Sequence, residues 1–182
     1  MFDSPVITFE QAHRGYRRLR RLAYEATTRV APAGLRPFTL TEIDPAALEA
    51  WRTTWTHRRH WTGEGGFPWD VLSRRYCRKP RCFHVAIWSG VVLCGMAVGW
   101  VSGSHGRLTL HYMESSPDPR HPLRGDITFI AFTAAARYGR AVGGHILALR
   151  NPLPGVTERY ARLGFALACK QRGNLYYCKQ LT

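Results

Sequence analysis

The chain has 182 residues, 45% hydrophobic and 12% aromatic, which suits one domain with a sizeable core and excludes a disordered chain. Twenty-six lysines and arginines stand against 12 aspartates and glutamates, giving a formal net charge of +14. This excess favours an anionic partner, such as a nucleic acid, an acidic membrane surface or a phosphorylated cofactor.

Cysteine usage and the N-terminal residues bear on the compartment. The five cysteines are an odd number, and the opening MFDSPVITFE contains neither a basic leader nor a long apolar run. The apolar stretch 91–101 is interrupted by Gly95 and Gly99 and is shorter than the roughly 18 residues of a membrane span. We therefore expect a soluble protein of the reducing cytoplasm, with no membrane span.

Residues 1–32 are predicted to form a basic amphipathic helix and a linker. Apolar residues recur at spacings of three and four from Phe9 to Ala23, and arginines occupy most of the other positions. An ordinary surface helix fits this pattern, and so does a helix that contacts nucleic acid or a membrane. Two prolines and a glycine within 30–37 predict the linker, so we place the main domain at 33–182.

The remaining chain alternates strand and helix patterns in a definite order. A short strand at 38–41 precedes a helix that Asp44 caps, that Pro45 begins and that extends to about His60. Tight turns separate three further strands, which are therefore expected to be antiparallel. The predicted elements after His60 are a helix at 69–76, strands at 82–88, 91–102 and 108–113, a helix at 127–142, a strand at 145–149, a short helix, and a final hairpin around 172–174.

This order predicts an α/β (α+β) fold. The strands form a mixed, mostly antiparallel central sheet of about seven strands, with helices on both faces.

A basic turn after the 69–76 helix contains two cysteines and a histidine, Cys77, Cys82 and His84. Their spacing is poor for zinc, and no second Cys or His pair follows at the usual distance. We therefore predict no metal site.

The most distinctive stretch is 150–165, RNPLPGVTERYARLGF. Asn151 follows an apolar strand, and Tyr160 lies on the apolar face of a short helix that Gly164 ends. We expect Asn151 and Tyr160 to face one cleft. The alternative is that Tyr160 is a core aromatic residue and that Leu-Gly-Phe only ends the helix.

This stretch resembles the GCN5-related N-acetyltransferases (GNATs), in which an Asn after the fifth strand, a helix and a Tyr-x-x-Leu-Gly-Phe ending form one side of the acetyl-CoA site. Asn151 and the run 160–165 match that pattern, and the order of the upstream elements extends the resemblance over roughly residues 33–182. The resemblance implies a GNAT fold, acetyl-CoA as co-substrate, and direct attack of an amine on the thioester.

The loop before the 127–142 helix departs from the family pattern. GNATs usually carry Gln/Arg-x-x-Gly-x-Gly/Ala there, because backbone N–H groups at the helix N-terminus approach the CoA pyrophosphate closely. In SSPDPRHPLRGDITF only Arg124 and Gly125 match, and Asp126 would repel a phosphate. Side-chain charge from Arg120, His121 and Arg124 is expected to compensate. The expected cofactor-binding residues are Ser115, Arg120, Arg124, Gly125 and Asn151.

The reaction requires a base for the amine and a proton for the departing thiolate. A phenol with a pKa of about 10 keeps its proton at neutral pH, so we assign Tyr160 as the general acid. The end of the 108–113 strand offers His111 and Glu114 as bases, with Glu114 preferred if it acts through water. Both residues are equally compatible with a role as strand-end polar groups.

Two functions of different classes follow. The first is an acetyl-CoA-dependent N-acetyltransferase whose acceptor is unknown; aminoacyl-tRNA, as in the toxin branch of the family, or a protein are candidates. The alternative is a non-catalytic nucleic-acid-binding module on the same fold, with 14–21 and 74–81 as its basic patches. Oligomeric state stays open, including a homodimer.

Overall fold

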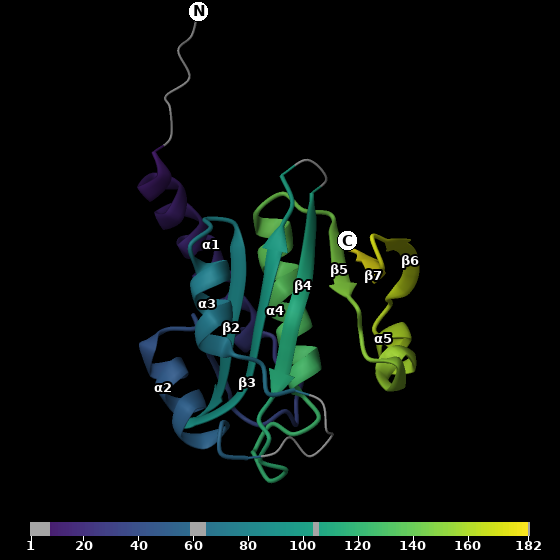
Figure 1. Ribbon diagram of the computed structural model, residues 1–182. Helices are drawn as coiled ribbons and strands as arrows, with labels where there is room; N and C mark the ends of the chain where they lie inside the picture. The colour runs from purple at the N-terminus through teal and green to yellow at the C-terminus, as the bar shows by residue number, and fades with distance from the viewer. Residues whose placement is uncertain (1–7, 59–64, 104–105, 182) are drawn as a thin grey trace, which may run out of the picture.

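The computed structural model describes residues 8–58, 65–103 and 106–181. A seven-stranded sheet in the order β1-β2-β3-β4-β5-β7-β6 lies at its centre (Figure 1). The strands are β1 (Thr39–Thr41), β2 (Cys82–Ser89), β3 (Val92–Val101), β4 (Arg107–Ser115), β5 (Ile146–Arg150), β6 (Ala166–Gln171) and β7 (Asn174–Gln180). The helices are α1 (Phe9–Arg29), α2 (Pro45–Thr54), α3 (Trp69–Cys77), α4 (Ile127–Ala141) and α5 (Thr157–Arg162), which the short 3₁₀ turn Pro154–Val156 precedes.

The sheet is mixed, and the predicted fold class is confirmed. The antiparallel pairs are β1 with β2, β2 with β3, β3 with β4, β5 with β7, and β7 with β6. Among the described strands, only β4 and β5 pair in parallel, because α4 crosses over between them. In the final hairpin Arg172 and Gly173 both have positive φ, at 48° and 77°, as a two-residue turn of this hand requires.

Helices cover both faces of the sheet, α1 and α4 on one and α2 and α3 on the other (Figure 1). Residues of β2 alternate between the two resulting cores: Phe83 and Val85 face α4, and Cys82 and Ala86 face α3. Because both faces are covered, β2 and β3 are almost continuously buried and apolar rather than alternating with polar residues.

Helix α1 is part of the same core as the sheet. Its Ala23 and Tyr24 are each 4% exposed and pack in the cluster that contains α4. Arg20 is also 4% exposed, and its guanidinium lies 2.9 Å from Glu42, which pairs with Arg17 at the same distance. The predicted basic patch 14–21 is therefore wrong in part, because Arg20 points inward to satisfy a carboxylate.

The predicted start of α2 is confirmed, but its predicted length is wrong. The side chain of Asp44 accepts a hydrogen bond from the Ala47 N–H at 2.9 Å, and Pro45 stands at the first helical position. The helix ends at Thr54, earlier than the predicted His60, which lies outside the described residues. Within the described residues, no helix combines the length and apolarity that crossing a bilayer requires.

Candidate active site

Strands β4 and β5 separate halfway along β4. Their pairing runs from Arg107 opposite Ile146 to Leu110 opposite Leu149, whereas β4 continues to Ser115. Among the described residues no strand pairs with β4 on that side beyond Leu110. Within the described part of the chain, the backbone of 111–114 therefore has no strand beside it on the β5 side, and an extended ligand with amide groups can bind there.

A β-bulge marks the point of separation. Tyr112 pairs with Val98 and Leu110 with Gly99, so His111 is the extra residue on β4. Glycine is needed at position 99, because a Cβ there would lie 2.5 Å from the Thr109 carbonyl oxygen. Bulges re-aim side chains and occur beside active sites.

His111 contacts a residue that the sequence did not single out. Its Nδ1 lies 2.9 Å from the hydroxyl oxygen of Tyr76 on α3. Burial, followed by the charges of Arg150 and Arg75, lowers the pKa of His111 to about 4. The imidazole is therefore neutral at pH 7, with a hydrogen on one ring nitrogen and a lone pair on the other. No sequence signal distinguished Tyr76 from an ordinary core aromatic residue of α3.

Glu114 is only 6% exposed, and its carboxylate already accepts hydrogen bonds from other residues of the chain. It accepts hydrogen bonds from the backbone N–H of Gly66 at 2.6 Å, from that of Phe67 at 3.3 Å, and from the indole N–H of Trp69 at 2.6 Å. The residue thus ties the segment before α3 to β4. With three donors on its oxygens, this carboxylate is a poor position for accepting a substrate proton.

A cationic hollow of about 360 Å³ lies at the start of α4. His121 lines this hollow, and its Nε2 lies 2.9 Å from the hydroxyl oxygen of Ser115, the last residue of β4. His121 is 5% exposed, and its Nδ1 is buried with no hydrogen-bond partner among the described residues. The lining residues are Gly34, Arg36, Pro119, Arg120, His121, Pro122, Arg124 and Asp126.

The N-terminus of α4 adds backbone donors and a partial positive charge to this hollow. Asp126 stands at the N-cap, but its side chain makes no capping hydrogen bond. A side-chain cap is therefore missing from the first turn, where backbone N–H groups lack partners within the helix. Gly125 has φ of 92°, and no atom lies within 4 Å of the position that a Cβ would take. Three arginines line the hollow against the carboxylate of Asp126, so its net positive charge and the open first turn of α4 fit a phosphate group.

Asn151 holds strands together in this structure. Its side-chain oxygen accepts a hydrogen bond from the Leu175 N–H at 2.8 Å, and its amide nitrogen donates to Asn174 at 2.8 Å. Its φ of 48° turns the chain out of β5. These contacts connect the end of β5 to the start of β7.

Tyr160 has different neighbours. It is 8% exposed, and its ring centroid lies 5.5 Å from that of Phe132 on α4 and 6.4 Å from that of Phe165. Burial raises the pKa of the phenol. Asn151 and Tyr160 have no neighbour in common among these contacts, and their placement in one cleft stays a prediction.

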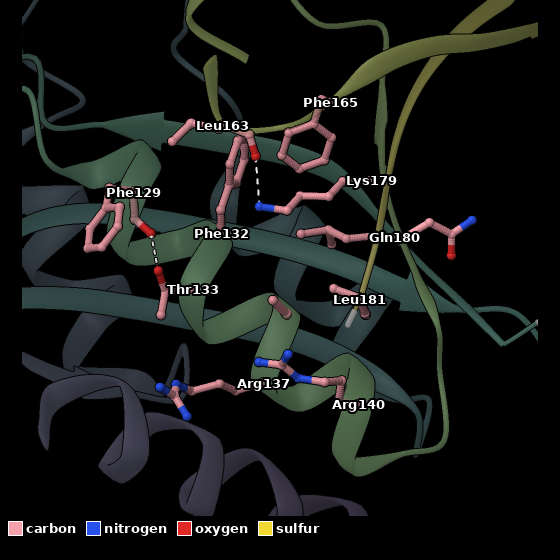
Figure 2. A pocket seen from close by; sticks show the side chains of 12 residues that line it. Phe129, Phe132, Thr133, Arg137, Arg140, Leu163, Phe165, Lys179, Gln180 and Leu181 are labelled. Atoms are coloured by element: carbon pink, nitrogen blue, oxygen red, sulfur yellow. Dashed lines mark hydrogen bonds between the residues drawn. The ribbon is translucent and has the colours of Figure 1, made fainter. Parts of the chain in front are cut away.

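Leu163 and Phe165 of the Leu-Gly-Phe ending line an apolar groove of about 250 Å³ beside α4 and the end of β7 (Figure 2). Gly164 has φ of 84°, as expected for a helix-ending glycine. The Nζ of Lys179 donates a hydrogen bond to the Leu163 carbonyl oxygen at 2.7 Å. Figure 2 shows Arg137 and Arg140 along the α4 side of this groove, which the sequence patterns did not indicate.

The comparisons with known proteins identify the fold. No family sequence model matches the chain, and no curated protein sequence matches it. The structure, by contrast, is similar to that of nourseothricin acetyltransferase, with a TM-score of 0.56 and 17% identity over 80% of this chain and 99% of that one. It is also similar to the ribosomal-protein-S18-alanine N-acetyltransferase from Escherichia coli, with a TM-score of 0.59 and 15% identity over 80% and 94% of the two chains.

A third similar structure is an aminoglycoside 6′-N-acetyltransferase complexed with coenzyme A. Its TM-score is 0.59, at 13% identity over 79% of this chain and 97% of that one. The fold of the chain is therefore that of the GNAT N-acetyltransferases, as the sequence resemblance implied.

Proposed function

We propose that the protein is an acetyl-CoA-dependent N-acetyltransferase. The observation that carries the proposal is the part of β4 beyond Leu110 that no described strand pairs with on the β5 side and that leads toward the cationic hollow of α4. An extended ligand with a phosphate at one end and amide groups along its length matches both features at once. Coenzyme A has this chemistry.

The cofactor phosphates would be held by charge more than by backbone. Arg36, Arg120 and Arg124 are exposed at the hollow. Gly125 leaves open space beside the first turn of α4. Together these residues supply the charge-assisted hydrogen bonds that the usual glycine-rich loop supplies through its N–H groups.

Acetyl-CoA supplies a thioester that an amine attacks directly. For the base we favour His111 over Glu114, because its imidazole is neutral while the Glu114 carboxylate already accepts three hydrogen bonds. Tyr76 orients the ring through the contact with Nδ1. Tyr160 remains the proposed general acid, since burial keeps its phenol protonated.

The net charge of +14 supports an acceptor amine carried by a polyanion, such as aminoacyl-tRNA. A basic surface of this size exceeds what one CoA molecule requires. A protein amine is the other candidate acceptor. The same charge supports the non-catalytic nucleic-acid-binding alternative, which differs in requiring no acetyl-CoA.

The decisive experiment is thermal unfolding of the full chain with acetyl-CoA. A ligand at 100 times its Kd stabilises the folded state by about 2.7 kcal/mol, which a melting curve resolves. Because a strongly basic protein also binds polyanions without specificity, ATP and tRNA at matched phosphate concentration are the controls. Stabilisation by acetyl-CoA beyond these controls supports the enzyme. Equal stabilisation by all three, without release of free CoA in the presence of amines, would contradict it.

A further inference from the structure

Two thiols and an imidazole converge on the α3 side of the sheet. Cys77 is the last residue of α3, Cys82 is the first of β2, and His84 follows two residues later on the same face of the strand. The two sulfur atoms and one imidazole nitrogen all lie within 4.8 Å of one another. The turn between the cysteines is fixed by backbone hydrogen bonds, including one of 3.1 Å from the Cys82 N–H to the Lys79 carbonyl oxygen.

The hydrogen bonds of His84 decide what this cluster can bind. Its Nδ1 accepts the backbone N–H of Ile43 at 3.1 Å, so in the neutral ring the hydrogen is on Nε2. A histidine that ligates a metal donates from its other nitrogen to an acceptor, and here that nitrogen faces a donor instead. His84 is therefore arranged to donate a hydrogen bond and not to offer a lone pair.

Two charged side chains lie beside the cluster, Arg20 and Glu42, which are paired at 2.9 Å. Arg20 is buried and donates to the Cys82 carbonyl oxygen at 2.9 Å. A hydrogen bond from Cys82, followed by contacts with His84 and the charge of Arg20, lowers the pKa of Cys77 to about 5 against the effect of burial. Burial raises the pKa of Cys82 itself. The Arg20 guanidinium is paired with Glu42, and it favours the thiolate form of Cys77.

We propose that Cys77 and Cys82 are a redox-active pair, in which the partly exposed Cys77 thiolate reacts with a hydroperoxide and Cys82 resolves the product to a disulfide. Only Cys77 of the pair reaches the surface, which assigns it the attacking role. Closing the sulfur atoms to a bond of about 2.0 Å draws the last turn of α3 toward β2.

The chemistry balances with the peroxide as the sole oxidant. The Cys77 thiolate attacks one peroxide oxygen, the O–O bond breaks, and the hydroxide or alkoxide that leaves takes up the proton that the Cys77 thiol had released to the buffer, giving a sulfenic acid. Cys82 sulfur then attacks the Cys77 sulfur. The S–O bond breaks as the S–S bond forms, and the leaving hydroxide takes the Cys82 proton as water. The two thiols lose two electrons, and the peroxide is reduced to water, or to water and an alcohol if it is organic.

Alkylation of the full-length reduced protein with iodoacetamide tests the thiolate. Trypsin cuts after Arg78 and Arg81, so mass spectrometry follows the two cysteines in separate peptides. Between pH 8 and pH 6 a free cysteine with a pKa of about 8.5 loses reactivity roughly 75-fold, and N-acetylcysteine in the same tube gives this reference. Cys77 should lose less than about twofold. A Cys77 rate that falls in parallel with N-acetylcysteine overturns the proposal.

Stoichiometric hydrogen peroxide tests the disulfide. The wild-type protein should yield a linked peptide containing Cys77 and Cys82, and a Cys94→Ser control should yield the same. In Cys82→Ser, dimedone should trap Cys77 as the sulfenic acid. Absence of the linked peptide in the wild-type protein contradicts the pair, whether or not the variants fold. Binding of one equivalent of zinc that protects both thiols from iodoacetamide also overturns it and identifies a metal site instead.

Discussion

The hydroxyl oxygen of Tyr76 lies 2.9 Å from Nδ1 of His111, which joins the last turn of α3 to the bulge of β4. The two residues are 35 positions apart in the chain. This contact places a neutral, oriented imidazole at the point where β4 and β5 separate. It makes His111 the favoured base among the residues near the end of β4.

The two candidate bases should respond differently to substitution. His111→Gln should lower turnover by about 10²- to 10⁴-fold with a nearly unchanged melting temperature, because it removes a proton acceptor but keeps a polar side chain. Glu114→Gln should instead destabilise the fold by roughly 1–3 kcal/mol, because an amide cannot accept all three of the donors that the carboxylate accepts. Melting curves and rates per folded molecule separate the effects. If His111→Gln instead lowers stability and Glu114→Gln instead lowers turnover, Glu114 is the base.

The low pKa of His111 predicts a pH dependence of stability. The folded-state pKa is about 4, below the roughly 6.5 of an unfolded histidine, so between these values only the unfolded chain binds the proton. Stability should therefore fall as pH falls from about 6.5 toward 4, and the group contributes no slope above that range. Urea unfolding at pH 7 and pH 5 should show a larger loss for the wild-type protein than for His111→Gln. Equal losses would mean that His111 titrates normally.

Charge reversal tests the phosphate hollow. Arg124→Glu should weaken acetyl-CoA binding at least tenfold, because it replaces a cation beside the start of α4 by a like charge to the phosphate. Arg14→Glu is the matched control, since Arg14 is an exposed arginine of α1 with the same change in net charge. Isothermal titration at two salt concentrations gives both affinities. Equal weakening by the two substitutions would show that only overall charge matters.

Tyr160→Phe distinguishes a catalytic phenol from a core ring. The ring contacts with Phe132 and Phe165 survive the change, so stability should be nearly constant. If the phenol protonates the thiolate, turnover should fall by about 10²- to 10⁴-fold while acetyl-CoA affinity is retained, because the hydroxyl acts in the transition state. Full turnover in a stable variant would show that another group or water supplies the proton.

Two glycine substitutions should change stability in opposite directions. Gly15 lies exposed inside α1, and no atom lies within 4 Å of the position that an added methyl group would take, so Gly15→Ala should stabilise the protein by roughly 0.5–1 kcal/mol. Gly99→Ala should destabilise it, because the new Cβ would meet the Thr109 carbonyl oxygen at the bulge. Urea unfolding measures both. If Gly99→Ala leaves the free energy of unfolding unchanged, the backbone of the bulge shifts to accommodate the methyl group.

Local sequence patterns determined the order and type of the elements. Asp44 and Pro45 begin α2 through contacts within one helical turn, and Gly164 ends the helix that contains Tyr160. The buried runs of β2 and β3 and the tight turn between them predict an antiparallel pair without knowledge of any distant residue. These features are readable because their physical causes lie within a few neighbouring positions.

The chemistry of the side chains was decided by tertiary contacts. The Glu114 carboxylate accepts hydrogen bonds from donors 45 to 48 positions away in the chain. Arg20 is buried because it donates hydrogen bonds to Glu42 and to the carbonyl oxygen of Cys82. Cys77, Cys82 and His84 have a poor metal spacing, yet the turn between α3 and β2 brings them together, and Ile43 fixes the histidine tautomer. Spacing along the chain specifies which face of an element a residue occupies, but which partner meets it, and hence its pKa and reactivity, follows only from how the elements pack.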